Sequence, residues 1–446
     1  MATSTRAFYI DLYREHLEEA SFLYEQRLAL YPNPEVTWKK IGAFEERLEA
    51  HIDGLVVGDK LALDICKTHA AEGDFGELFA AMCVFCRQAR RDLVLSALEQ
   101  LDPGDNKKAT AVADAFKFEI PDAWLSDFLT LLGSGDPKLA PILGRAFGYR
   151  RQQCGPQLMN AMRRCAPAAL PGIVWSLGRI AYEPAKGPLL DYLHSEEEPV
   201  RSAAAIALAR IGEHAVIDYC LGQAAANSWS ILPLALAGGH SVLGPLTELS
   251  RKKAAECAIA LGIIGDPASV PLLISLLEQE DASGPAALAL LCITGADLYE
   301  TVFVPDEMDE GELFDSEREQ LKQGKPLDRG DGRPFGSNVT RLSQNPDDWN
   351  RWWRTNGTRF VPGVPYRHGG SLSPGRLTEM LAADRTPNVL RRFGCEELAI
   401  RYRSDFGLET DMPAVRQIKL LSEAAVWSTS QVRFQEGAWY FAGTPV

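Results

Sequence analysis

Apolar residues recur at helical spacing through the first part of the chain. Between Tyr9 and Tyr24, apolar or aromatic residues return every three or four positions, with Glu and Arg between them. A second stripe of the same kind runs from Phe44 to Leu55. This spacing is typical of helices that bury one face. Residues 1–120 are therefore predicted to form a helical N-terminal region.

Local signals predict where these helices begin and end. Asn33 and Pro34 suit the N-cap and the first position of the helix that carries the second stripe. Two further helices are expected, around 61–69 and 75–98.

From residue 121 to residue 298 the pattern becomes repetitive. Short apolar helices end in small, glycine-containing turns and restart at a proline or a small capping residue. These turns end at residues 181, 212, 239, 265 and 295, which gives steps of 31, 27, 26 and 30 residues. Such periods are typical of stacked helix pairs, because one pair alone cannot bury its apolar face. Residues 121–298 are predicted to form an α-solenoid.

Residues 299–344 interrupt this pattern. Eight carboxylates and one arginine lie between residues 306 and 319, and several glycines and prolines follow them. This composition favours a mobile loop or linker.

The last stretch, 345–446, mixes helix and turn signals. Helices are expected near 374–383 and 387–403, and the alternation in 427–441 permits a β-hairpin. The chain is therefore predicted to be mainly α-helical, with a small mixed α/β C-terminal domain that is rich in Arg and Trp.

Charge is unevenly distributed along the chain. The whole chain carries 46 − 60 = −14, whereas residues 333–403 hold twelve Arg, no Lys and six acidic residues, a local balance of 12 − 6 = +6. The negative total argues against a protein whose main task is to grip nucleic-acid phosphates. It is compatible with an acidic surface that binds a basic partner.

Several features predict a cytoplasmic protein. No apolar run approaches the roughly 18 residues of a membrane helix, and the N-terminus lacks the basic-then-apolar order of a secretory signal. The nine cysteines are odd in number, thinly spread and mostly embedded in apolar stretches. Such usage is typical of thiols in a reducing compartment.

The motifs reveal no catalytic, metal or cofactor site. Cys83 and Cys86 form a CxxC, but no second pair or histidine lies at zinc-ligand spacing, and the pair falls within a predicted helix. The seven histidines form no recognised set. The hypothesis of an enzyme rests only on the mixed C-terminal region and on His368, which lies in a turn rich in Arg and aromatic residues. The chain is predicted not to be an enzyme and to need no cofactor.

An aromatic and basic cluster has two interpretations. Three tryptophans share one helix face and three arginines lie beside them: Trp349, Trp352, Trp353, Arg351, Arg354 and Arg359. The cluster could stack on nucleobases or dock a peptide. The simpler interpretation, which we favour, is that the tryptophans seal the end of the solenoid. The role of the arginines is then undecided.

Phrases at both ends of the chain resemble one known family. The N-terminal phrases are His16-Leu-Glu-Glu-Ala-Ser-Phe-Leu-Tyr-Glu-Gln and Glu45-Glu-Arg-Leu-Glu-Ala-His-Ile-Asp-Gly-Leu55. The C-terminal ones are Trp352-Trp353…Arg359-Phe360…Gly363…Tyr366…Gly369 and Glu396-Glu397-Leu398-Ala399. They resemble proteobacterial HEAT-repeat proteins encoded in type VI secretion gene clusters. The resemblance implies short, lyase-type HEAT-like repeats and a type VI secretion setting, but it brings no catalytic residues with it.

Together these features suggest a non-catalytic protein-binding protein, since solenoids offer extended concave surfaces. The main hypothesis is an immunity protein that neutralises a cognate effector toxin, such as a basic nuclease, through an acidic surface. The alternative is an adaptor or chaperone that loads an effector onto the secretion spike, and an enzyme of unknown reaction comes third. The expected partner is a protein, with no direct contact to nucleic acid or membrane.

Charge also selects candidate partner-binding residues. The acidic candidates, for a basic partner, are Glu196, Glu197, Glu198, Asp306, Glu307, Asp309, Glu310 and Glu312. The basic candidates, for an acidic partner, are Arg351, Arg354, Arg359 and Arg367.

Overall fold

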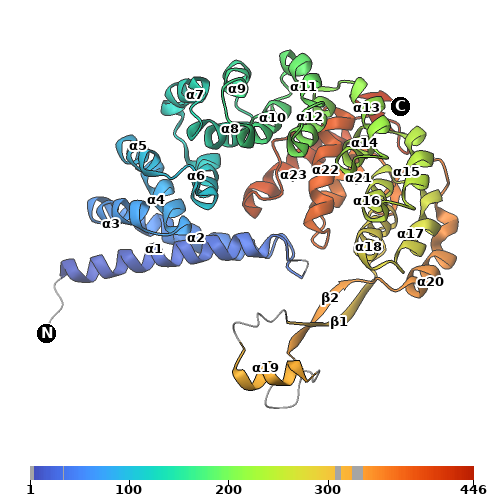
Figure 1. Ribbon diagram of the computed structural model, residues 1–446, viewed down its shortest axis with the longest axis horizontal. Coiled ribbons are helices and arrows are strands. Elements are labelled where there is room, and N and C mark those ends of the chain that lie inside the picture. The colour runs from blue at the N-terminus through green and yellow to red at the C-terminus, as the bar shows by residue number, and fades with distance from the viewer. Residues whose placement is uncertain (1–4, 34, 307–312, 324–334) are drawn as a thin grey trace.

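The computed structural model describes residues 5–33, 35–306, 313–323 and 335–446. In Figure 1 the helices up to α18 follow one continuous arc, and α22 and α23 lie inside the curve of that arc. The predicted mainly α-helical solenoid is confirmed.

The arc begins with six helices, of which α1 and α4 contact most of the others. They are α1 (Thr5–Leu30), α2 (Gly42–Val57), α3 (Asp59–Glu72), α4 (Phe75–Arg87), α5 (Arg91–Gln100) and α6 (Asn106–Glu119). A capping box fixes the start of α4, because the Asp74 carboxylate accepts from Glu77 N at 2.7 Å and the Glu77 carboxylate accepts from Asp74 N at 3.1 Å. The apolar stripes predicted for α1 and α2 face inward, with Leu17, Leu48 and Ile52 buried.

Two predicted boundaries in this region are wrong. The single helix expected over 75–98 is two helices, because Ala89 has a φ of 53° and turns the chain between α4 and α5. Arg90 N then donates to Phe85 O at 2.8 Å, which satisfies a carbonyl at the end of α4. Asn33 does not cap α2: its side chain accepts from Glu35 N at 2.9 Å, and α2 begins only at Gly42. Pro34 lies outside the described residues.

From α7 onward the helices alternate between an outer and an inner row (Figure 1). The outer row holds α7 (Leu125–Ser134), α9 (Gly155–Met162), α11 (Lys186–Tyr192), α13 (Ala215–Gln223), α15 (Leu243–Leu249) and α17 (Val270–Leu276). The inner row holds α8 (Leu139–Tyr149), α10 (Leu170–Arg179), α12 (Glu198–Ile211), α14 (Ile231–Ala237), α16 (Ala254–Ile264) and α18 (Glu280–Thr294). Short 3₁₀ turns precede several of them: η1 (Asp122–Trp124), η2 (Pro167–Ala169), η3 (Glu183–Ala185), η4 (Ser228–Ser230), η5 (His240–Val242) and η6 (Pro267–Ser269).

Small residues let neighbouring inner helices approach closely. A Cβ added to Gly178 of α10 would lie 2.7 Å from Ala207 Cα of α12, and one added to Gly262 of α16 would lie 2.7 Å from Ala289 Cα of α18. These contacts are too short for any side chain at the two glycines, so the inner row owes its tight spacing to them.

Gly178→Ala is therefore expected to lower the free energy of unfolding by about 1–3 kcal/mol, because α10 and α12 must move apart. Gly172→Ala, on the same helix, is the matched control, since its added Cβ meets nothing within 4 Å. It is expected to be neutral or to stabilise by up to about 1 kcal/mol. Urea unfolding followed by circular dichroism measures both, and equal effects of the two substitutions would contradict the proposed close packing.

The described parts of residues 299–344 are not the continuous loop that was predicted. They hold an antiparallel two-stranded ribbon of β1 (Tyr299–Pro305) and β2 (Gly336–Leu342), with α19 (Asp315–Lys322) between the strands. Val302 pairs with Val339 in register, and Arg341 Nε lies 2.9 Å from Glu300 Oε1. β-branched and aromatic residues explain the strands. The ribbon projects away from the arc (Figure 1).

The C-terminal region contains the remaining elements. They are α20 (Pro346–Asn356), η7 (Gly357–Arg359), the pair β3 (Tyr366–Arg367) and β4 (Gly370–Ser371), α21 (Pro374–Ala382), α22 (Asn388–Tyr402), α23 (Ala414–Thr429), and the pair β5 (Tyr440–Phe441) and β6 (Thr444–Pro445). The hairpin predicted over 427–441 is wrong in place, because α23 extends to Thr429 and the observed strand pair begins at Tyr440. Trp349 of α20 is buried and donates to Ser343 O at 2.7 Å, as expected for a residue that seals the solenoid against α17.

Contacts between the two ends of the chain close the arc into a ring. Arg27 Nη2 of α1 donates to Asp411 O at 2.6 Å, and Ala414 N at the start of α23 donates to Glu45 Oε2 of α2 at 2.6 Å. The loop after α1 also reaches the ribbon, since Thr340 N donates to Glu35 Oε1 at 2.9 Å. The concave face of the solenoid is therefore not an open surface.

Candidate functional site: a clasped concave face and a central cleft

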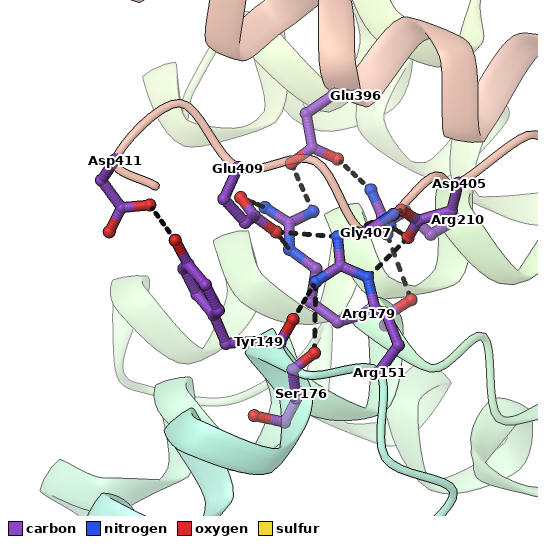
Figure 2. A network of polar contacts seen from close by, with 12 residues as sticks. Tyr149, Arg151, Ser176, Arg179, Arg210, Glu396, Asp405, Gly407, Glu409 and Asp411 are labelled. Carbon is purple, nitrogen blue, oxygen red and sulfur yellow. Dashed lines mark hydrogen bonds and ion pairs between the residues drawn. The ribbon is translucent and has the colours of Figure 1, made fainter. Parts of the chain in front are cut away.

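Three polar side chains repeat along the inner row of helices: Tyr149, Arg179 and Arg210. Each lies two residues before a residue that ends its helix with a positive φ. These φ angles lie between 46° and 87°. Equivalent positions of stacked helices lie side by side, so the three side chains form one row on the concave face (Figure 2).

Carboxylates of the C-terminal region meet this row. Glu396 bridges two repeats: its Oε1 accepts from Arg179 Nη1 at 2.5 Å, and its Oε2 accepts from Arg210 Nη1 at 2.8 Å. Asp411 Oδ1 accepts from the Tyr149 hydroxyl at 3.0 Å. One short C-terminal stretch thus joins three successive repeats.

Arg151, just after α8, extends the network. Its Nη2 donates to Glu409 Oε1 at 2.8 Å, and its Nε donates to Asp405 Oδ2 at 2.9 Å. Arg210 also donates to Asp405, and Arg179 Nη2 donates to Glu409 Oε2 at 3.3 Å. We call this set the clasp: Tyr149, Arg151, Arg179, Arg210, Glu396, Asp405, Glu409 and Asp411.

The clasp holds its acids in the charged form. Burial alone would raise the pKa of Glu396, but the guanidinium groups of Arg179 and Arg210 outweigh it and lower the pKa from 4.5 to about 2. Burial likewise opposes the charge of Asp405, and Arg210 and Arg151 lower its pKa from 3.8 to about 2. These carboxylates are structural anions and are poorly suited to proton transfer near neutral pH.

A second, fully buried cluster continues the same contact toward the far end of the arc. Glu397 Oε1 accepts from Arg367 Nη2 at 2.6 Å and from Arg401 Nε at 3.0 Å. Arg401 also donates to Ala235 O at 2.9 Å, and Arg367 donates to Gly262 O at 2.6 Å. The two arginines thus satisfy carbonyl groups at the C-terminal ends of α14 and α16.

A cleft of about 1590 Å³ remains inside the ring. One wall consists of the inner faces of α8, α10, α12, α14 and α18, and the opposite wall is formed by residues 384–393 around the start of α22. The loop 31–40 and the base of the ribbon also line it, and Arg179, Glu396 and Glu409 of the clasp form part of its floor. We call this space the central cleft.

Comparison with known families identifies the repeats. Residues 155–236 match HEAT repeats. Residues 254–279 match the PBS lyase HEAT-like repeat. No curated protein and no solved structure matches the chain.

The solenoid is thus built of HEAT-like repeats, and this part of the predicted resemblance is confirmed. HEAT-like repeats point to a protein-interaction scaffold. Across the described residues, no helix is both long and apolar enough to span a bilayer.

The acidic candidates that the structure describes lie in two separate places. Glu196, Glu197 and Glu198 are exposed at the edge of the HEAT-like repeats, where α12 begins. Asp306 is exposed just beyond β1. The remaining acidic candidates lie outside the described residues: Glu307, Asp309, Glu310 and Glu312.

The predicted basic candidates are divided between surface and interior. Arg351, Arg354 and Arg359 are exposed, and the guanidinium carbon of Arg359 lies 5.9 Å from the ring centroid of Trp352. Arg367 is completely buried, because it is needed between the HEAT-like repeats and Glu397. The prediction that Arg367 faces a partner is wrong.

The prediction from sequence missed the clasp and the central cleft. A signal for the clasp is present, since Arg179 and Arg210 occupy the same place in two otherwise apolar turns, Gly178-Arg179-Ile180 and Ala209-Arg210-Ile211. A charged residue that returns at the period of a buried stripe indicates a specific partner at that position.

The candidate chemistry considered from sequence finds little support. Cys83 and Cys86 are buried within α4, and burial raises the pKa of both thiols. Among the described residues, no three His, Cys, Asp or Glu side chains are grouped to hold a metal ion. Burial lowers the pKa of His368, whose backbone N donates to Cys292 O at 2.6 Å.

Proposed function

We propose that this chain is a non-catalytic binding protein that engages a secreted effector of a type VI secretion system. The central cleft is the observation that carries the proposal. Its volume of about 1590 Å³ exceeds the roughly 300–1,000 Å³ typical of small-molecule sites, so a segment of another protein is the better fit. The family resemblance at both ends of the chain supplies the secretion setting. The nine free cysteines support a reducing, cytoplasmic location for this encounter.

An immunity role is one form of this proposal. The net charge of −14 favours encounter with a basic toxin, since complementary charge speeds association. Glu196, Glu197 and Glu198 support it, because they are exposed and form no ion pair with any other described residue. In this role the protein would bind the toxin and block its active surface.

An adaptor role is the second form, and the ribbon favours it. β1 and β2 project away from the ring, and Phe303 and Val304 are more than two-fifths exposed there. A molecule with both a cleft and a projecting ribbon has two separate surfaces, which suits a protein that holds an effector and docks it onto the secretion spike.

Affinity purification of the tagged protein from its native cytoplasm, with salt elution and mass spectrometry, tests the proposal. We expect an effector to be recovered. A toxin released steeply by salt, together with rescue of cells that make it, would support immunity. Recovery of spike components, with lost secretion and no self-poisoning on deletion, would support the adaptor. Recovery of neither, with a catalytic turnover that His368→Ala abolishes, would contradict the proposal.

A further inference from the structure

A second row of side chains lies one helical turn from the clasp on the same inner helices. Arg145, Trp175 and Ile206 each precede a row member, Tyr149, Arg179 or Arg210, by four residues. Positions four apart share one face of a helix, so these side chains continue the concave face beyond the clasp. All three line the central cleft.

The central cleft carries cations that the chain itself does not neutralise. Lys40, Arg145, Arg385 and Arg392 line it and are exposed, and none of them forms an ion pair with another described residue. They come from three segments of the chain: the loop after α1, helix α8 and residues 384–393. An exposed guanidinium group without a counter-charge is ready to accept a carboxylate at little desolvation cost.

The carboxylates of the central cleft are already engaged. Glu396, Glu409 and Asp411 belong to the clasp, Asp384 pairs with Lys39, and Glu35 accepts from Thr340 N. The cleft therefore presents an excess of positive charge on a protein whose net charge is −14. Such a local reversal of sign focuses an anionic partner on the cleft.

Half-exposed apolar side chains lie between these cations. Trp175, Ile206, Leu232 and Leu288 face the cleft from the HEAT-like repeats, and Val389 faces it from α22. Four of these five side chains are aliphatic, and aliphatic side chains suit the apolar residues of a peptide. Aromatic rings such as that of Trp175 also line the cleft, and such rings can stack on nucleobases, so an oligonucleotide is the comparison that the test needs. The clasp shows that this face of the solenoid already binds one acidic segment, residues 405–411 of the same chain.

We infer that the central cleft binds an extended, acidic segment of a partner protein in which carboxylates alternate with apolar residues. The carboxylates pair with Arg145, Arg385 and Arg392, and the apolar residues contact the apolar side chains between these arginines. The inference rests on the proposed function in one respect, which is that the partner is a protein. It differs from the acidic-surface hypothesis, because it assigns the negative charge at this contact to the partner.

Fluorescence anisotropy with the full-length protein tests the inference. The probe is a labelled peptide of about twelve residues in which Glu alternates with Leu. Comparison probes are the same peptide with Lys in place of Glu, and a twelve-nucleotide oligo-dT. We expect the Glu–Leu peptide alone to bind, with a Kd that rises with salt. Arg145→Glu/Arg392→Glu should raise this Kd at least about tenfold.

A matched double variant controls for charge and folding. Arg163→Glu/Arg251→Glu makes the same charge change at two exposed arginines that do not line the cleft, and it is expected to leave the Kd unchanged. Arg145→Lys/Arg392→Lys should retain most of the binding. Thermal unfolding followed by circular dichroism verifies that every variant is folded.

Three results would overturn the inference: no binding of the Glu–Leu peptide, equal Kd values for the wild type and the cleft variant, or tighter binding of oligo-dT through the same arginines. The outcome is separable from the proposed function. If the Arg145→Glu/Arg392→Glu variant still recovers the native effector, the inference fails and the proposed function stands. If the peptide binds as expected but no effector is recovered, the proposed function fails and the inference stands.

Discussion

Glu397→Gln is expected to lower the free energy of unfolding by about 4 kcal/mol. The substitution removes the one carboxylate that contacts both Arg367 and Arg401, at 2.6 and 3.0 Å. Both arginines are fully buried, and neither can reach water unless α22 separates from α14 or β3 separates from α18. Loss of one partner from a buried ion pair typically costs about 3–5 kcal/mol, because a charge stays buried without compensation. Urea unfolding followed by far-UV circular dichroism measures the change.

Glu379→Gln is the matched control in the same region. Glu379 lies 2.7 Å from Arg376 in an exposed pair on α21, so its loss is expected to cost less than about 1 kcal/mol. Similar losses from the two substitutions would show that Glu397 is no more important than a surface charge. The C-terminal region would then not depend on this cluster for its place inside the arc.

The clasp and the Glu397 cluster change how the solenoid is expected to bind a partner. In an open solenoid the whole concave face is available. Here the C-terminal ends of α10, α12, α14 and α16 are covered by residues 396–411 and by Arg367. Among the described residues of the concave side, the central cleft is therefore the surface that the chain leaves free for a partner.

The sequence predicted the helices well where local signals are strong. Apolar residues at three- and four-residue spacing predicted stacked helix pairs, and glycine turns marked helix ends at 212, 265 and 295. The prediction failed where a non-glycine residue takes a positive φ, as Ala89 does, since no local preference of alanine favours that conformation. It failed again in β1 and β2, because the flanking acidic and Gly/Pro-rich residues concealed the short β-branched stretches.

The candidate site was harder to predict because its contacts are long-range. Arg179 and Glu396 are 217 residues apart, and Arg151 and Glu409 are 258 apart. Helical periodicity shows which residues share a face, but not which distant segment covers that face. The surplus of arginine in 333–403 is visible in the sequence. The sequence alone could not show that three of these arginines are buried, namely Arg367, Arg391 and Arg401.

Glu396→Gln is expected to destabilise the protein in a pH-dependent manner. The pKa of Glu396 is about 2 in the folded protein and about 4.5 in the unfolded chain, so its charge stabilises the fold above pH 4.5. This stabilisation is lost as the pH falls from about 4.5 to about 2. At pH 7 the substitution should cost about 3 kcal/mol, from a pKa difference of about 2.5 units. At pH 3 the cost should be about half of that, because the Glu396 carboxylate is then mostly protonated in the unfolded wild-type chain, although it is still mostly charged in the folded protein.

Urea unfolding of wild type and Glu396→Gln at several pH values between 3 and 7 measures this difference. The exposed Glu379→Gln variant serves as the control, and its difference from wild type should stay within about 0.5 kcal/mol over the whole range. The comparison isolates one carboxylate, since Asp405 and Asp411 titrate in both proteins. A cost of Glu396→Gln that does not change with pH would mean that it arises from lost packing. The two guanidinium groups would then not be holding the C-terminal segment by charge.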